Sequence, residues 1–584
     1  MSNPNPKIIY TNPALERSGY NPHSGTGNNT QDARNRTDEV RTSKRVLPAI
    51  THVDKDNGMF YDELNRVRIF RGMALSYKIA PFLPMIDAFN PVSSFAEDDL
   101  RLLDKLNLNV IRLGISWAAV QPRRGSDGFD TEYLARIRQM VQTWEDAGLY
   151  VIIECHQDLF AEKFMGDGAP SWAITRDWNT LPFPMPVHGL ARAKYDPLLG
   201  ADSAPTNMNY TDSWGFHYVS DSVTRAFWGL YTNYEGVQDE FVGFWGKLAE
   251  TFTGMNNVIG YEIINEPFVA ARSTLHFPLA WLTRDRTDKN FLQPMYDRVE
   301  AVIRQYDSRG LIFWEPVAGS GGSLGDGFTK TPGDRPDKSV FSFHSYGPNA
   351  IDSLTMETAI TKGVYQAKRL GGGRMLTEWD VEYVQGPRRL KRVGWQFKQF
   401  ARVAGSPPHG TLVDPRTGVY RPGMCKLFSR PYPSAVSGEL IGFAFNWTTS
   451  ELTVDAAPPS SGDAEIIISV TEEELWGWEG SWRLQSVSRA DGERIGHVRV
   501  EDESELDVKG KGVRWWVERA WVEGSKLVKI RLGTDWTGPA KVVIGLSGAS
   551  GAGMQELPEE HEFDQHWDFD ASHPLNGSWN DWKM

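Results

Sequence analysis

Short apolar runs alternate with amphipathic segments from about residue 66 of this 584-residue chain to residue 376, and this alternation constrains the fold more than any other feature. A short apolar run suits a strand that is buried on both faces, and the amphipathic segments between the runs suit helices that cover a sheet. Repeated strand–helix units predict a parallel sheet. We therefore predict an α/β fold, a (β/α)8 TIM barrel, over residues 46–430.

The predicted barrel strands are short. An eighth strand near Trp395 is less clear, because only 17 positions separate Trp395 from Glu378, where we expect a full helix. The other candidate strands are residues 69–75, 109–113, 149–153, 258–264, 311–314, 340–343 and 374–376.

Two of the predicted helices have recognisable start signals. Ser94 and Glu97 have the spacing of a capping box. Asp130 can cap the next helix, which Gly148 ends. Apolar residues recur on one face of these helices at Leu100, Leu103 and Leu106, and at Tyr133, Ile137, Val141 and Trp144.

Composition excludes several classes of protein. The chain is 40% hydrophobic and 12% aromatic, which excludes a mostly disordered protein. Its formal charge of −13 argues against nucleic acid as a partner, since phosphate binding needs concentrated positive charge. Cys155 and Cys425, the two cysteines, cannot build a disulfide framework or a structural zinc site. No apolar run is long enough to span a membrane.

The remaining segments suggest a four-part organisation. Residues 1–45 read as a flexible N-terminal arm, residues 431–550 as a β-sandwich domain and residues 551–584 as an acidic tail. The histidines of the tail are interpreted as part of a solvated segment, not as a metal site. The start of the chain is not a recognisable secretory signal, which favours the cytoplasm, although an incomplete N-terminus would leave secretion open.

Polar residues gather where the predicted strands end. In a (β/α)8 barrel the chemistry lies at the carboxyl ends of the strands. Arg112 lies in the second strand, and the third strand runs into His156 and Asp158. The later strand ends carry Asn265 and Glu266, then His344 and Tyr346, and then Glu378.

Two carboxylates facing one cavity suit glycoside hydrolysis. One carboxylic acid protonates the leaving oxygen, and the other carboxylate attacks the sugar carbon or activates water. Glu266 and Glu378 are the candidates. Asn265 is placed to bond the sugar 2-hydroxyl, Arg112 to keep Glu378 ionised and Tyr346 to bond Glu378.

At this point the chain resembles a known family. Asn265-Glu266-Pro267 and the later Glu378 resemble the retaining (β/α)8 glycosidases that include family 5 cellulases. Residues 109–117, 156–160 and 166–172 are similar to endoglycoceramidases and related glycosylceramidases. Arg430-Pro431-Tyr432-Pro433 and the strands that follow resemble the C-terminal β-sandwich of that family.

The resemblance implies a retaining mechanism without a metal or organic cofactor, with Glu266 as acid/base and Glu378 as nucleophile. It implies a glycolipid substrate, cleaved between the sugar and a lipid that is usually ceramide. Lys78, His156 and Asp158 match positions that would hold the sugar next to the lipid. His344, Tyr346 and Trp395 complete the expected substrate-binding set.

Alternatives from the residues remain open. An exo-acting glucosylceramidase, a steryl-glucosidase and a cellulase-type β-glucanase share the same machinery, and a non-catalytic sugar-binding protein would need neither glutamate. Gly321-Gly322-Ser323-Leu324-Gly325 matches the serine-hydrolase motif, but glycine, serine and proline around it predict a loop, so we reject that nucleophile. The aromatic-rich loop 160–234 is either a lid for the lipid or an aromatic mini-core, and a transient membrane-surface contact and the oligomeric state stay open.

Overall fold

A computed structural model describes most of the barrel and the strands of the sandwich. The described residues are 47–78, 80–91, 93–164, 166–174, 218–272, 276–318, 327–345, 356–379, 392–394, 397–398, 412–413, 425, 428–446, 449–461, 464–471, 482–489, 494–495, 498–499, 506–508, 513–519, 526–533, 536 and 538–546.

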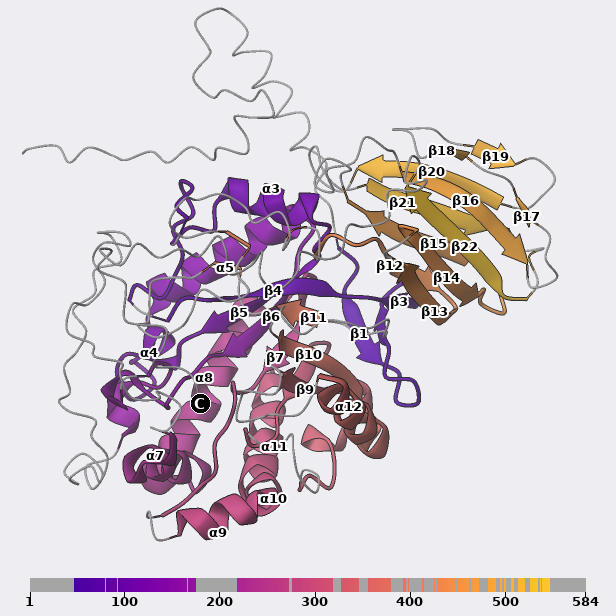
Figure 1. The fold of residues 1–584 in the computed structure, drawn as a ribbon. Helices are drawn as coiled ribbons and strands as arrows, with labels where there is room; N and C mark the ends of the chain where they lie inside the picture. The colour runs from indigo at the N-terminus through magenta and orange to yellow at the C-terminus, as the bar shows by residue number, and fades with distance from the viewer. Residues whose placement is uncertain are drawn as a thin grey trace, which may run out of the picture.

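Eight parallel strands close into a barrel, with the last strand hydrogen-bonded to the first (Figure 1). In barrel order they are β4 (Arg71–Ser76), β5 (Val110–Ile115), β6 (Tyr150–Cys155), β7 (Val258–Glu262), β8 (Leu311–Trp314), β9 (Ser339–Ser345), β10 (Gly373–Trp379) and β11 (Arg392–Gly394). The predicted (β/α)8 barrel is therefore confirmed. Its eighth strand exists and ends directly before Trp395, so the short connection does not remove it.

Helices surround the barrel strands (Figure 1). The α-helices are α3 (Glu97–Lys105), α4 (Trp117–Val120), α5 (Thr131–Asp146), α7 (Asp221–Tyr231), α8 (Val237–Phe252), α9 (Phe277–Leu282), α10 (Arg284–Thr287), α11 (Gln293–Ile303) and α12 (Met356–Leu370), with a π-helical stretch over Asp288–Leu292. Helix α5 begins as predicted, since the Asp130 side chain accepts a hydrogen bond from the backbone N–H of Tyr133. In the described part of the chain, no helix is long and apolar enough to cross a membrane.

The predicted capping box at the start of α3 is wrong. The N-cap residue is Ala96, and the Asp99 carboxylate accepts the Ala96 backbone N–H at 2.9 Å. Ser94 instead donates its hydroxyl to Asp99 at 2.9 Å. The buried ammonium of Lys398 lies against the same carboxylate at 2.6 Å, so Asp99 has a tertiary partner that local spacing could not reveal.

Alternation along each barrel strand separates a helix-facing side from an interior side. On β5, Ile111 and Leu113 join the core that includes the surrounding helices, whereas Val110 joins the barrel interior. Arg112 is two positions after Val110, so it points into the barrel as well. The lower interior is apolar, with residues such as Phe313 and Met375. Charged side chains one layer higher therefore stand on an apolar floor.

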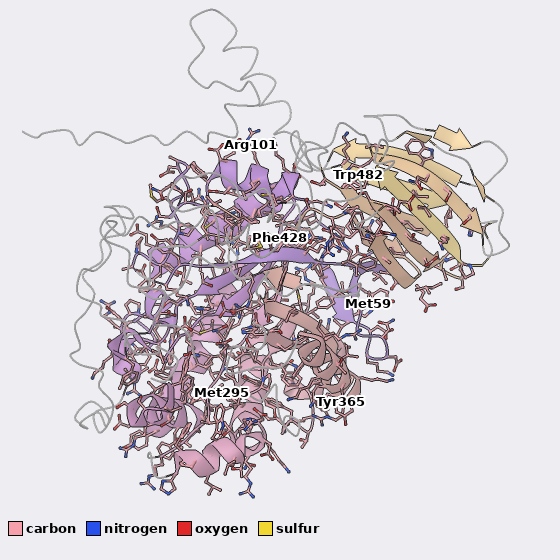
Figure 2. The ribbon with its side chains drawn as sticks, in the orientation of Figure 1. Met59, Arg101, Met295, Tyr365, Phe428 and Trp482 are labelled. Atoms are coloured by element: carbon pink, nitrogen blue, oxygen red, sulfur yellow. The ribbon has the colours of Figure 1, made fainter. Side chains whose placement is uncertain are left out.

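A two-sheet β-sandwich lies beside the barrel (Figure 1). The first sheet has the order β1 (Ile50–Val53), β2 (Phe60–Asp62), β3 (Arg66–Arg68), β12 (Tyr432–Ser437), β15 (Ala464–Val470), β21 (Lys526–Leu532), β20 (Val513–Arg519) and β19 (Leu506–Val508). The second has β13 (Glu439–Asn446), β14 (Glu451–Ala457), β22 (Ala540–Leu546), β16 (Trp482–Arg489) and β17 (Arg494–Ile495), and β18 (Val498–Arg499) also pairs with β16. Trp482, labelled in Figure 2, is fully buried in the core of the sandwich.

The sandwich begins before the barrel in the sequence. Strand β3 pairs with β12, so residues 50–68, which we predicted to belong to the barrel, lie in the first sandwich sheet. The reason is that a strand's hydrogen-bonding partner is set by tertiary packing and not by its own residues. The Arg71 guanidinium ties the two parts together, since it donates to the carbonyl oxygen of Arg430 at 2.7 Å and lies 4.3 Å from the centre of the Tyr432 ring.

Candidate active site

Arg112 occupies the centre of the charged layer. Its side chain is fully buried, and its Nε donates to Glu262 at 2.6 Å and its Nη1 to Glu378 at 2.6 Å. Nη2 donates to the side-chain oxygen of Asn265 at 3.0 Å. Burial alone would lower the pKa of Arg112, but the surrounding carboxylates, led by Glu154, raise it well above its usual value. Arg112 is therefore a fixed positive charge beside Glu378.

His344 lies between the two predicted catalytic carboxylates. Its Nδ1 is 2.8 Å from Glu266 Oε1 and 3.4 Å from Glu378 Oε2. Burial favours the neutral ring, but Glu315, Glu378 and Glu266 outweigh it and raise the pKa of His344 to about 10. The ring is therefore protonated near neutral pH and can donate to both glutamates.

Glu266 and Glu378 differ in their surroundings. The Glu378 side chain is 4% exposed and ends β10, whereas the Glu266 side chain is 25% exposed on the loop after β7. One carboxylate oxygen of each lies within 4.8 Å of the other and of His344. This is the close spacing of carboxyl groups, about 5–5.5 Å, that retaining glycosidases use.

A reciprocal hydrogen-bond pair holds the loop that carries Glu266. Gln157 Nε2 donates to the carbonyl oxygens of Asn265 at 2.8 Å and Glu266 at 3.1 Å. Asn265 Nδ2 donates back to the carbonyl oxygen of Gln157 at 3.1 Å. Because Gln157 follows β6, this pair connects the ends of two neighbouring strands and orients Asn265 towards Arg112. Sequence reasoning did not single out Gln157, although it lies between His156 and Asp158.

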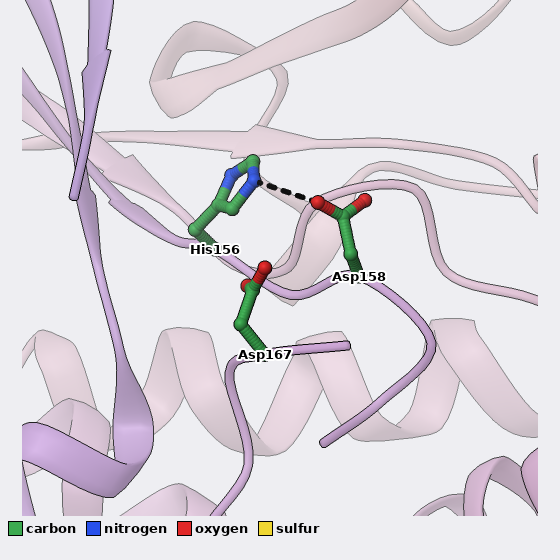
Figure 3. Close-up of side chains that lie close together, drawn as sticks. All are labelled: His156, Asp158 and Asp167. Carbon is green, nitrogen blue, oxygen red and sulfur yellow. Dashed lines mark ion pairs between the residues drawn. The ribbon is translucent and has the colours of Figure 1, made fainter. Parts of the chain in front are cut away.

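A second charged cluster lies next to the carboxylates, at the end of β6. His156 Nε2 is 3.6 Å from Asp158 Oδ2, and Asp167 lies alongside (Figure 3). Lys78 forms an ion pair with Asp158 and lies 3.9 Å from Asp167. Burial favours protonation of Asp158, but Lys78 and His156 prevail and lower its pKa; burial raises that of Asp167, which Lys78 only partly opposes.

The loop that presents Asp167 is held against the end of β6. Asp158 and Asp167 form an isolated antiparallel bridge, with the Asp167 N–H donating to the Asp158 carbonyl oxygen at 2.8 Å. A Cβ on Gly166 would lie 1.7 Å from that same oxygen, and Gly168 has a φ of +105°. Glycine is therefore required on both sides of Asp167.

The structure brings together eight of the ten predicted site residues. Around Glu266 and Glu378 lie Asn265, Arg112 and His344, while Lys78, His156 and Asp158 form the neighbouring cluster. Tyr346 and Trp395 lie outside the described residues, as does Ser323 of the rejected serine-hydrolase motif and most of the aromatic loop, residues 175–217.

Sequence reasoning missed three buried glutamates of the charged layer. Glu154 ends β6 two positions before His156 and lies 3.1 Å from its Nδ1. Glu262 is the last residue of β7, and Glu315 directly follows β8. A charged residue inside or directly after an otherwise apolar strand was the available signal, because such a side chain needs a buried partner.

Three groups of these residues have the composition of metal-ligand sets, and each already faces a protein cation. His156, Asp158 and Asp167 surround Lys78, and the two groups that contain His344 include a glutamate that contacts Arg112. The pKa of His156, like that of His344, is raised to about 10, since Glu154 outweighs burial and Lys78. Protonated imidazoles do not ligate metals, so ion pairing is the arrangement that these residues fit.

A closed (β/α)8 barrel with paired carboxylates at its strand ends defines a glycoside hydrolase. The chain belongs to glycosyl hydrolase family 5, since the family described as "Cellulase (glycosyl hydrolase family 5)" matches residues 85–406. It is 32% identical over 419 residues to an endoglycoceramidase of Hydra vulgaris, covering 69% of this chain and 77% of that protein. An endoglycoceramidase of Cyanea nozakii is 29% identical over 420 residues, covering 68% and 80%.

The solved structure of endo-glycoceramidase II from Rhodococcus sp. has the same fold. It matches with a TM-score of 0.59 at 21% identity, over 83% of this chain and 98% of that one. Both the barrel and the β-sandwich that follows it lie within the span of this likeness.

Proposed function

We propose that this chain is a retaining β-glycosidase that cleaves the bond between the sugar and the ceramide of glycosphingolipids. The observation that carries the proposal is the pair Glu266 and Glu378, with carboxylate oxygens within 4.8 Å of each other on one buried imidazole. The ceramide substrate is supported by the two relatives that are named endoglycoceramidases.

The two carboxylates take different roles because their surroundings differ. Glu378 is held by Arg112 at 2.6 Å and by His344, so its ionised form is stabilised and suits a nucleophile. Glu266 is on a loop and more exposed, next to the position of a leaving group, and it suits a general acid. In the first step Glu378 bonds to the anomeric carbon, the glycosidic bond breaks, and Glu266 gives its proton to the ceramide oxygen.

The second step returns the enzyme to its starting state. Water attacks the anomeric carbon, Glu266 takes the proton of that water, and the bond to Glu378 breaks. The free sugar leaves with the β-configuration that it had in the substrate. Two inversions at the anomeric carbon account for this retention.

The cluster of Lys78, His156 and Asp158 provides the sugar contacts in this proposal. Its members are buried and ion-paired to one another, so donors and acceptors are held in place before the sugar arrives. Asn265, oriented by Arg112 and Gln157, is adjacent to Glu266 and serves the sugar 2-hydroxyl. Tyr346 and Trp395 stay in the proposed substrate-binding set.

The test compares wild type with Glu266→Gln and Glu378→Gln on a lactosyl ceramide, a steryl glucoside and cello-oligosaccharides. We expect wild type to release intact lactose and ceramide, and each variant to be slower by about 10²–10⁴-fold or more. Proton NMR of the first product should show the β-anomer.

Other outcomes separate the alternatives. Release of glucose from glucosylceramide or from the steryl glucoside, with no cleavage of the lactosyl ceramide, indicates an exo-acting enzyme. Cleavage of cello-oligosaccharides alone indicates a β-glucanase. Binding of sugar with no cleavage of any substrate indicates a sugar-binding protein, and wild-type activity in Glu378→Gln contradicts the mechanism.

A further inference from the structure

Glu315 is a buried glutamate that the two catalytic steps do not use. It directly follows β8, and its side chain is 4% exposed. Phe313, two positions earlier, belongs to the barrel interior, so the Glu315 side chain points to the same side of the strand. Tyr296, on α11, donates its hydroxyl to the Glu315 carbonyl oxygen at 2.9 Å and holds the backbone there.

Three residues close a ring around the proposed acid/base. Glu315 Oε2 accepts the backbone N–H of Glu266 at 3.3 Å. Glu315 Oε1 is 3.4 Å from Nε2 of His344, and Nδ1 of the same imidazole is 2.8 Å from Glu266 Oε1. Glu315 therefore contacts Glu266 twice: directly at the backbone, and through His344 at the carboxylate.

Glu266 needs such support because of its backbone. Its φ is +38°, in the left-handed region that a residue with a side chain rarely adopts. A conformation of this kind persists only where the surrounding structure holds it. Gln157 holds the Glu266 carbonyl oxygen, and Glu315 holds the N–H, so the two sides of this residue are fixed from neighbouring strands.

The charge of Glu315 also acts on His344. Glu315 is the largest of the influences that raise the pKa of His344. With Nε2 facing a carboxylate, the ring keeps a proton on Nδ1 as well, and that N–H points at Glu266. An apolar residue in place of Glu315 would leave Nε2 facing no acceptor and the Glu266 N–H with no side-chain partner.

We propose that Glu315 is a positioning residue for the acid/base step, acting on Glu266 through its backbone N–H and through His344. The inference rests on the proposed function, since it assigns Glu315 to proton delivery to the leaving group. Glu315 acts through other residues and is not itself a catalytic residue.

The test uses two substrates that differ in their need for a proton. The ceramide oxygen of a lactosyl ceramide must be protonated to leave, whereas the dinitrophenolate of 2,4-dinitrophenyl β-lactoside leaves without a proton. For Glu315→Ala we expect kcat/KM on the lactosyl ceramide to fall by about 10²-fold, as for the loss of a general acid, and kcat/KM on the dinitrophenyl lactoside to stay near that of wild type. The ratio kcat/KM is used because it reports the first step.

Two further variants make the readout specific. Glu315→Gln keeps an oxygen for the Glu266 N–H but removes the charge, so its loss should lie between those of wild type and Glu315→Ala. Glu300→Ala is the control, since Glu300 is a buried glutamate on α11 that pairs with Arg304 at 2.6 Å. Its ratio between the two substrates should equal that of wild type.

Several results would overturn the inference. Equal losses on both substrates in Glu315→Ala, with Glu315→Gln at the wild-type ratio, would mean a general structural role. An unchanged ratio in both variants would mean that Glu315 does not act on Glu266. If wild type cleaved neither substrate, the proposed function would fail first, and the inference with it.

Discussion

Arg112 and Glu378, from the second and the seventh strand of the barrel, are joined by a hydrogen bond of 2.6 Å between Nη1 and Oε1. The same guanidinium donates to Glu262 and to Asn265, so one side chain connects the nucleophile with the loop that carries the acid. The barrel closes these strands into a ring, and Arg112 joins them across its interior.

Replacing Arg112 is expected to harm both folding and catalysis. Arg112→Met leaves the buried carboxylates without their cation and should lower the free energy of unfolding by about 3–5 kcal/mol. Arg112→Lys keeps the charge but cannot donate to three acceptors at once, so it should unfold nearer to wild type while kcat falls about 10²-fold. Urea denaturation and steady-state kinetics measure these effects. A lysine variant with wild-type kcat would contradict the role given to the guanidinium fork.

Gly168 should be intolerant of a side chain. Gly168→Ala places a Cβ 2.5 Å from that of Gln157, at a φ of +105°. Gly254→Ala is a matched control, since its φ is +82° but nothing lies within 4 Å, and it should cost only about 1–2 kcal/mol. We expect Gly168→Ala to cost more in thermal unfolding and to raise KM for glycolipid, because Gln157 and Asp167 shift. Equal effects of the two substitutions would argue against this.

Asp167 should make stability depend on pH in a defined direction. Burial, opposed by Lys78 and helped by Asp158, raises the pKa of Asp167 from 3.8 to about 7. The folded state therefore keeps a proton up to about pH 7 that the unfolded state loses near pH 4, so the contribution of Asp167 to stability falls as pH rises through this window. Asp167→Asn removes the effect.

Urea denaturation of wild type and Asp167→Asn across this window checks the prediction. The free energy of unfolding of the variant minus that of wild type should increase from about pH 4 to about pH 7 and be level above it. A constant difference would mean that Asp167 titrates normally in the folded protein.

Lys398 and Asp99 form a fully buried ion pair at 2.6 Å, between the segment after β11 and the start of α3. Lys398 also donates to Ser94 Oγ at 2.9 Å. Lys398→Met should lower the free energy of unfolding by about 3–5 kcal/mol, since Asp99 keeps an unpaired charge. Adding Asp99→Leu should recover much of that loss. A double-mutant cycle measures the coupling, and additive effects would show that the two residues do not interact.

Much of the architecture could be predicted from local pattern. The run Leu311–Trp314 is a strand with the expected bounds, and so is Lys526–Leu532 in the sandwich. Both follow from periodicity, which neighbouring residues determine by themselves. The start of α3 could not be predicted in this way, because Asp99 acts as its cap while held by Lys398, about 300 residues away.

The sequence by itself determined which segments become strands and helices, and which polar residues stand at strand ends, including Glu266 and Glu378. Only the tertiary structure decided that Glu154, Glu262 and Glu315 join them around Arg112 and His344, and that residues 50–68 complete a sheet with β12. The physical reason is that periodicity sets the face on which a side chain lies. Its partners depend on strand register and on the closure of the barrel, which bring distant segments together.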